Sequence, residues 1–274
     1  MTSGLRDAGL DALNLFFPRR CCFCGAVLQR GTCICAVCFA TVIPIEGETC
    51  GRCGAPLMKE TRVGGDTTRD KGSPFAGGAA AAAGANSHVS GCPQCDDLRL
   101  LFERNESYGV FQGALRELIH YYKFGKRRSL RRLFTEILVE SKRRFILGHD
   151  LIAPVPLTRE RALERGYNQS FLVAKGIAEK LSIAFYGEVL VRKGSSAPQS
   201  GIRTRRERLE NVTDRIWVGK KAVDRIRRSS VLLFDDVFTT GATASECAKA
   251  LMREGARSVD LLTIARALME PVDV

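Results

Sequence analysis

Two adjacent carboxylates, Asp235 and Asp236, stand between an apolar run and a loop of small residues. The run, residues 231–234, is typical of a strand buried on both faces of a parallel sheet. The acidic pair comes where that strand is expected to end. Carboxylates there can accept hydrogen bonds from vicinal hydroxyls or approach a divalent cation.

The loop after the acidic pair offers groups that bind an anion. Backbone N–H groups of a loop and helix start attract phosphate, threonine hydroxyls add donors, and a glycine lets the backbone approach the ligand closely. The loop consists of Thr239, Thr240, Gly241, Ala242 and Thr243, and a helix is expected over residues 244–254. Together with the acidic pair, this loop predicts a site for a sugar phosphate.

Four Cys-x-x-Cys pairs form a second group of residues that could carry out chemistry, in this case metal binding. Four thiolates satisfy Zn²⁺ in tetrahedral geometry, so the four pairs can hold two structural ions. Sequential and interleaved pairings both remain open, and Cys22 and Cys33 can substitute in the first site. Sequential pairing places Cys21, Cys24, Cys35 and Cys38 around one ion and Cys50, Cys53, Cys92 and Cys95 around the other.

The elements expected to position these groups alternate between helix and strand. Apolar spacing predicts helices over 3–17, 113–124 and 129–145, the last with Ser129 as N-cap, and a further helix with Asn168 as N-cap. Strands are expected over 151–155, 188–192 and 259–264. His120 is expected on a helix surface. Residues 57–91 form a Gly- and Ala-rich insert that we expect to be disordered.

Composition limits the function classes. A chain of 274 residues has room for one large domain or two small ones, and no apolar run is long enough to span a membrane. Polar residues interrupt the N-terminal apolar run, so we expect no signal peptide and a cytoplasmic location, where eleven cysteines favour metal over disulfides.

The formal charge of +12 is concentrated in two blocks. Residues 192–228 hold 12 Lys and Arg against 4 Asp and Glu, and residues 116–144 hold 10 against 3. Such blocks suit anionic partners, either polyphosphate or nucleic acid, although solvated helix faces give the same pattern.

In their order, these segments resemble the ComF family of phosphoribosyltransferase-like proteins over nearly the whole chain. Residues 231–243 resemble the phosphoribosyl-pyrophosphate (PRPP) motif of type I phosphoribosyltransferases. The other matching segments are the Cys-x-x-Cys module, residues 121–125, 153–156, 165–169 and 199–201, and Arg208 with Asn211 and Val212. The chain departs from the pattern in its longer insert and in Phe234, where valine is commoner.

The resemblance implies a fold and a set of roles. It implies an α/β fold, a type I phosphoribosyltransferase-like parallel sheet flanked by helices over residues 101–274, with a small N-terminal four-cysteine zinc module in residues 1–100. Asp235 and Asp236 would hold the ribose hydroxyls of Mg²⁺-bound PRPP, and residues 239–243 its 5′-phosphate. The pyrophosphate loop would comprise Val155, Pro156, Leu157 and Arg159, and a mobile loop over the site would contain Gln199, Arg203, Arg206 and Arg208. A solvated basic loop is the alternative for the last segment, and no general base can be nominated.

Three functions remain open. The first is an enzyme that transfers phosphoribosyl to a nitrogen acceptor. The second is a non-enzymatic competence factor that contacts single-stranded DNA or DNA-uptake proteins, although few aromatic residues accompany its basic blocks. The third is a regulator that senses PRPP without turning it over. The oligomeric state is not predicted.

Overall fold

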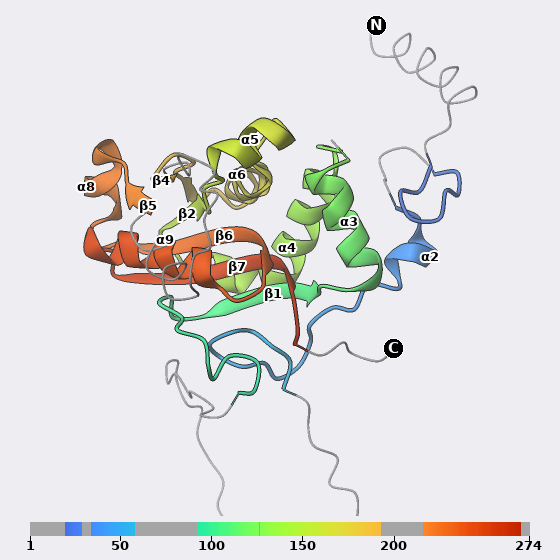
Figure 1. Ribbon diagram of the computed structural model, residues 1–274, viewed down its shortest axis with the longest axis horizontal. Coiled ribbons are helices and arrows are strands. Elements are labelled where there is room, and N and C mark those ends of the chain that lie inside the picture. The colour runs from blue at the N-terminus through green and yellow to red at the C-terminus, as the bar shows by residue number, and fades with distance from the viewer. Residues whose placement is uncertain (1–19, 29–33, 58–91, 126, 193–215, 270–274) are drawn as a thin grey trace, which may run out of the picture.

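A parallel five-stranded sheet forms the centre of the computed structural model, which describes residues 20–28, 34–57, 92–125, 127–192 and 216–269. The strand order is β1-β7-β6-β2-β3, and every neighbouring pair is parallel. The strands are β1 (Asn105–Val110), β2 (Leu151–Pro154), β3 (Ala184–Phe185), β6 (Ser230–Phe238) and β7 (Ser258–Arg266). The predicted α/β class with a parallel sheet is confirmed (Figure 1).

Helices cover both faces of this sheet. The first hydrophobic core lies between the sheet and α3 (Gly113–Lys123), α4 (Leu130–Ile146) and α6 (Gln169–Leu181). The second lies against α9 (Ala242–Arg253). The remaining described elements are α2 (Ala36–Phe39), α5 (Arg159–Arg165), a 3-10 turn at Lys220–Ala222, α8 (Val223–Ile226), and the antiparallel pair β4 (Leu190–Arg192) and β5 (Ile216–Val218).

The N-terminal cysteine segments take part in both cores. Cys21 and Cys38 belong to the first core cluster, and Cys53 and Cys92 belong to the second. The boundary predicted at residue 100 stays a prediction. Among the helices that the structure describes, none is both long and apolar enough to cross a bilayer.

Local sequence explains why the elements begin and end where they do. Residues 231–234 of β6 are completely buried because the sheet is covered on both faces. Asn168 caps α6 as predicted, since its side-chain oxygen accepts a hydrogen bond from the N–H of Phe171 at 3.2 Å. Ser129 occupies the N-cap position of α4 as predicted, but its backbone is already helical and its side chain makes no capping hydrogen bond.

One further expectation needs correction, and one helix was not predicted. Strand β6 does not end at the acidic pair but continues to Phe238, because its pairing with β7 extends to Arg266. Helix α5 was not predicted, and it has no buried residue from which an apolar stripe could arise. The helix expected over 3–17 lies outside the described residues, and so does the insert except for its first residue, Leu57. The N–H of Leu57 donates to the carbonyl of Glu48.

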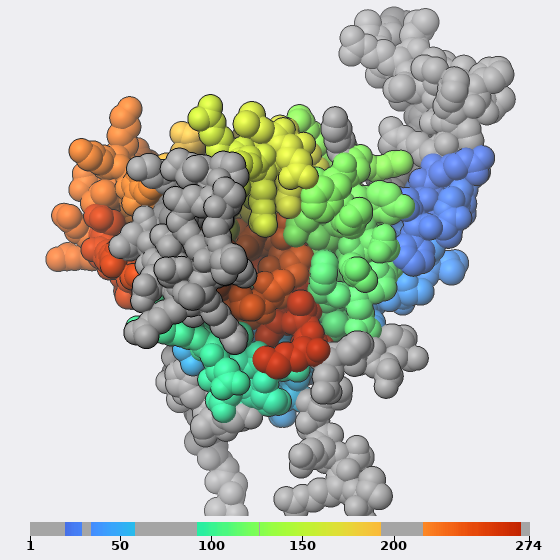
Figure 2. Space-filling model, viewed as in Figure 1, coloured from blue at the N-terminus to red at the C-terminus, as the bar shows by residue number. Residues whose placement is uncertain are grey.

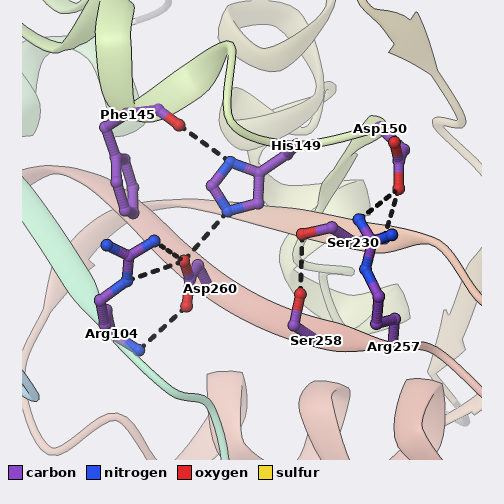
Figure 3. Close-up of polar contacts among 8 residues, drawn as sticks. All are labelled: Arg104, Phe145, His149, Asp150, Ser230, Arg257, Ser258 and Asp260. Atoms are coloured by element: carbon purple, nitrogen blue, oxygen red, sulfur yellow. Dashed lines mark hydrogen bonds and ion pairs between the residues drawn. The ribbon is translucent and has the colours of Figure 1, made fainter. Parts of the chain in front are cut away.

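A polar cluster around the buried side chains of His149 and Asp260 joins the amino ends of the strands (Figure 3). Arg104 donates to both carboxylate oxygens of Asp260, from its backbone N–H and its guanidinium, at 2.7–3.1 Å. His149 bridges the carbonyl of Phe145 (2.9 Å) and Asp260 (3.1 Å). Burial acts to raise the pKa of Asp260, but the hydrogen bonds from His149 and Arg104 outweigh it and hold the pKa below its usual value.

We predict that Asp260→Asn destabilises the protein in a pH-dependent way. Because the folded-state pKa is depressed, the carboxylate contributes stability above the unfolded-state value of 3.8, and this contribution is lost as the pH falls through the folded-state pKa. Asp260 is buried, whereas the Arg104 side chain is 48% exposed, so the expected loss is that of a hydrogen-bonded charged acceptor, about 2 kcal/mol. Urea denaturation at pH 7 should show a loss of this order, and the difference from wild type should shrink below about pH 4.

Asp150→Asn is the matched control for that experiment. Asp150 also pairs with an arginine, Arg257, at 3.1 Å, but both side chains are exposed. An exposed pair contributes less than about 1 kcal/mol. Equal losses in the two variants at pH 7 would contradict a special role for the buried carboxylate of Asp260.

Candidate functional site

The acidic pair lies near the carboxyl end of the central strand β6, and neighbouring helices hold each carboxylate. Asp235 Oδ1 accepts a hydrogen bond from Ser170 Oγ at the start of α6 (3.1 Å) and another from the N–H of Asp236 (2.8 Å). Asp236 Oδ1 lies 2.6 Å from Nζ of Lys123, the last residue of α3. Two elements that are distant in sequence therefore converge on the pair.

The environment of Asp235 favours its protonated form. Burial and the neighbouring charge of Asp236 raise its pKa to about 7, against the opposing effects of the Asp236 N–H, Lys123 and Ser170. A half-buried carboxyl that titrates near neutrality beside a second acid is typical of a functional site.

The predicted anion loop follows directly and leads into α9. Thr239 and Thr240 are exposed, and Gly241 is the N-cap residue of α9 with φ of +70°. A Cβ on Gly241 would lie 2.8 Å from Leu100 and 3.0 Å from Phe238, so both the backbone angle and the available space require glycine. Ala242 is exposed and Thr243 is half-buried at the helix start. The structure thus places the whole loop next to the acidic pair.

A buried arginine, Arg266, forms a hydrogen bond to the backbone of this loop. It is 1% exposed, its guanidinium lies 4.1 Å from the centre of the Phe238 ring, and Nη1 donates to the carbonyl of Thr239 at 3.0 Å. Nη2 donates to the carbonyl of Gln94, which lies between two cysteines of the second group. The anion loop is therefore linked to the cysteine segment through one side chain.

The segment predicted to bind pyrophosphate lies beside the acidic strand. Because β2 and β6 are parallel neighbours with Pro154 opposite Phe234, Val155 leaves the sheet close to the acidic pair, and its N–H donates to the carbonyl of Phe234 at 2.9 Å. Pro156 and Leu157 are half-buried, and Arg159 is exposed as the first residue of α5. Gln199, Arg203, Arg206 and Arg208 lie outside the described residues.

The eight paired cysteines come together in two groups that match the sequential pairing. Within each group the four sulfur atoms lie within 4.8 Å of one another. A tetrahedral zinc site with bonds of about 2.3 Å has sulfur atoms roughly 3.8 Å apart. The observed separations are 3.8 Å for Cys50–Cys95 and Cys53–Cys92 and 3.6 Å for Cys24–Cys35.

Backbone donors also point at these sulfur atoms. The N–H of Cys35 lies 3.4 Å from Cys21 Sγ, and the N–H of Cys38 lies 3.4 Å from Cys35 Sγ. Such donors stabilise thiolates in the first group, and the sulfur separations fit zinc in both groups. Cys22 is buried and belongs to neither group, and Cys33 lies outside the described residues.

Sequence reasoning missed Lys123, Ser170 and Arg266 as parts of the site. Lys123 and Ser170 lie in helices whose ends meet the acidic pair only after folding. Arg266 offered one signal, a charge two residues after the end of a predicted buried strand. A buried charge at such a position requires partners, and this expectation could have singled it out.

Comparison with known proteins gives relatives for both parts of the chain. A family model described as a double zinc ribbon domain matches residues 12–68. Competence protein F of Haemophilus influenzae is 30% identical over 183 residues, covering 64% of this chain and 78% of that protein. DNA utilization protein YhgH of Escherichia coli strain K12 is 28% identical over 190 residues, or 67% of this chain and 80% of the relative.

Among solved structures, one match is the glutamine PRPP amidotransferase of B. subtilis complexed with ADP and GMP. It aligns with a TM-score of 0.37 and 18% identity, covering 52% of this chain and 30% of that one. A likeness of this size carries no argument about function.

We predict that Asp235→Asn stabilises the protein at alkaline pH. A folded-state pKa of about 7, above the unfolded value of 3.8, means that ionisation opposes folding and that stability falls as the pH rises between these values. Removing the charge should raise the free energy of unfolding at pH 8 by on the order of 1 kcal/mol, allowing for partial exposure. Urea denaturation from pH 4 to pH 8 measures this, with the exposed Asp224→Asn as control. A variant less stable than wild type at pH 8 would refute the prediction.

We also predict two zinc ions per chain. Elemental analysis of purified protein should give a ratio near two, and Cys24→Ser or Cys95→Ser should each reduce it to near one, because each variant removes a ligand from a different group. Cys247→Ser, which alters a buried cysteine inside α9, is the control and should leave the ratio unchanged. A ratio of one in the wild type would show that only one group binds metal.

Proposed function

Because this chain belongs to the ComF family, we propose that it binds Mg²⁺–PRPP at the acidic pair and transfers the phosphoribosyl group to a nitrogen acceptor. The observation that supports the proposal most strongly is the continuity of β6, the acidic pair, the Thr-Thr-Gly loop and α9. This arrangement offers carboxylates and phosphate-binding N–H groups within one short stretch of chain.

Each part of the site has a role in this proposal. Asp235 and Asp236 accept hydrogen bonds from the ribose hydroxyls, and residues 239–243 surround the 5′-phosphate. Residues 155–159 face the pyrophosphate, with the arginines of residues 199–208 as further cations. Mg²⁺, when bound, neutralises charge on pyrophosphate and makes it a better leaving group.

The side chains of the protein hold the groups that would contact the ribose and the phosphate in position. Lys123 and Ser170 fix the two carboxylates, and Arg266 fixes the carbonyl of Thr239, so the ribose and phosphate contacts are arranged before the ligand arrives. The acceptor nitrogen then attacks C1′ as the bond to pyrophosphate breaks. No side chain is assigned as a general base.

A competence role without catalysis is the second candidate. The names of the relatives, competence protein F and DNA utilization protein, favour it. In that case single-stranded DNA or a protein of DNA uptake is the partner, and PRPP binding is either a regulatory signal or absent.

We predict that titration calorimetry with Mg²⁺ detects PRPP binding to the wild-type protein. Asp235→Asn/Asp236→Asn should weaken it by at least about 100-fold, because two hydrogen-bonded carboxylate contacts are lost. The control variant Asp150→Asn/Asp224→Asn removes two exposed carboxylates elsewhere and should bind PRPP as the wild type does. Absence of binding to folded wild type with its zinc content verified would overturn the proposal and favour the competence role.

A further inference from the structure

A basic pocket of about 480 Å³ lies between α3 and α5, beside the acidic pair. Four cations line it, and Phe111 and Phe124 supply aromatic surface; the cations are Arg116, Lys123, Arg161 and Arg165. Glu117 contributes the opposite charge. Figure 2 shows the yellow-green surface of α5 next to the green surface of α3. The size is that of pockets that hold small organic ligands, about 300–1,000 Å³.

Two short connections join this pocket to the acidic pair. Lys123 lines the pocket and contacts Asp236 at 2.6 Å. Arg165 donates to the side chain of Gln169 at 3.1 Å, and the next residue, Ser170, donates to Asp235. The pocket therefore borders the acidic pair.

An exposed aromatic ring forms part of the pocket wall. Phe124 is 48% exposed, unusual for a large apolar side chain at the end of a helix whose other apolar residues are buried. The Arg165 guanidinium lies 5.0 Å from its ring centre, and the His120 ring lies at 5.0 Å with a tilt of 46°. A ring presented in this way offers a flat ligand a stacking surface next to positive charge.

Arg116 and Arg161 are exposed cations on opposite walls of the pocket. Neither guanidinium forms an ion pair with any residue in the described part of the chain. Arg165 also keeps a buried Nε without an acceptor among those residues. Guanidinium groups without an acidic partner suit a carboxylate, which each can bind through two parallel hydrogen bonds.

We propose that this pocket binds the acceptor and that the acceptor is a flat nitrogen heterocycle carrying a carboxylate. This inference rests on the proposed phosphoribosyl transfer. The ring stacks on Phe124, and its carboxylate faces Arg116 and Arg161. The lone pair of the ring nitrogen forms the bond to C1′, while the C1′–O bond breaks and pyrophosphate leaves with its electron pair. Any proton on the nitrogen passes to water.

A nucleic-acid strand fits the pocket less well. Binding successive bases calls for several stacking aromatics along a groove. Here a single exposed phenylalanine, Phe124, stands among the cations that line the pocket. The local chemistry therefore favours a single small anion.

A charge series on one ring tests the proposal. Pyridine-3-carboxamide, pyridine-3-carboxylate and pyridine-2,3-dicarboxylate carry zero, one and two negative charges on the same ring. Titration calorimetry in the presence of ribose 5-phosphate and Mg²⁺ should show affinity rising roughly tenfold with each carboxylate. Arg116→Gln/Arg161→Gln should abolish this trend, whereas the exposed pair Arg143→Gln/Arg144→Gln on α4 should retain it.

The outcomes separate this inference from the proposed function. PRPP binding with equal, weak affinity for all three rings would overturn the acceptor class and leave the PRPP site intact. Ring binding that follows charge without any PRPP binding would overturn the phosphoribosyl transfer from which the acceptor role was inferred. Oligothymidylate binding that depends on Arg116 and Arg161, with no ring binding, would show a nucleic-acid site and also overturn the proposal. If the two double variants, at Arg116 and Arg161 and at Arg143 and Arg144, lowered the affinity for the carboxylates equally, the binding site would lie outside this pocket.

Discussion

The close approach of two carboxylates at the end of a buried strand is the constraint on which the site depends. Like charges on adjacent residues repel, and burial increases the cost of each. The structure offsets this cost from two sides, with the ammonium of Lys123 on Asp236 and the hydroxyl of Ser170 on Asp235. Helices α3 and α6 must therefore meet this point of the sheet with one of their ends, and their packing against it is what holds the pair in place.

The cysteine segment serves the same site from the other side. Gln94 accepts a hydrogen bond from Arg266, which in turn holds the carbonyl of Thr239. A zinc ion at the second group would fix the position of Gln94, since Cys92 and Cys95 on either side of it belong to that group. The cysteines of the second group also share a hydrophobic core with α9, so this segment supports the loop before α9 as well as its own fold.

Sequence reasoning found the parts whose signal is local. The apolar run before Asp235, the Asn168 cap and the Cys-x-x-Cys pairs each depend on neighbours within a few residues. The structure confirms the strand and the cap, and it groups the cysteines sequentially, a choice that the sequence had left open. Sequence reasoning missed what only the tertiary fold creates. Lys123 gained its role because α3 ends beside β6, and α5 escaped notice because an exposed helix without an apolar stripe has no periodic signal.

Titration of the Asp235 carboxyl by carbon-13 NMR, without and with Mg²⁺–PRPP, tests the central claim most directly. The free protein should show a pKa of about 7, set by burial and by Asp236. Binding of the cation and the ribose hydroxyls favours the carboxylate, so the pKa should fall towards the usual range for an aspartate. A free-protein pKa near the ordinary value of about 4, or a pKa unchanged by a saturating amount of Mg²⁺–PRPP, would contradict the account.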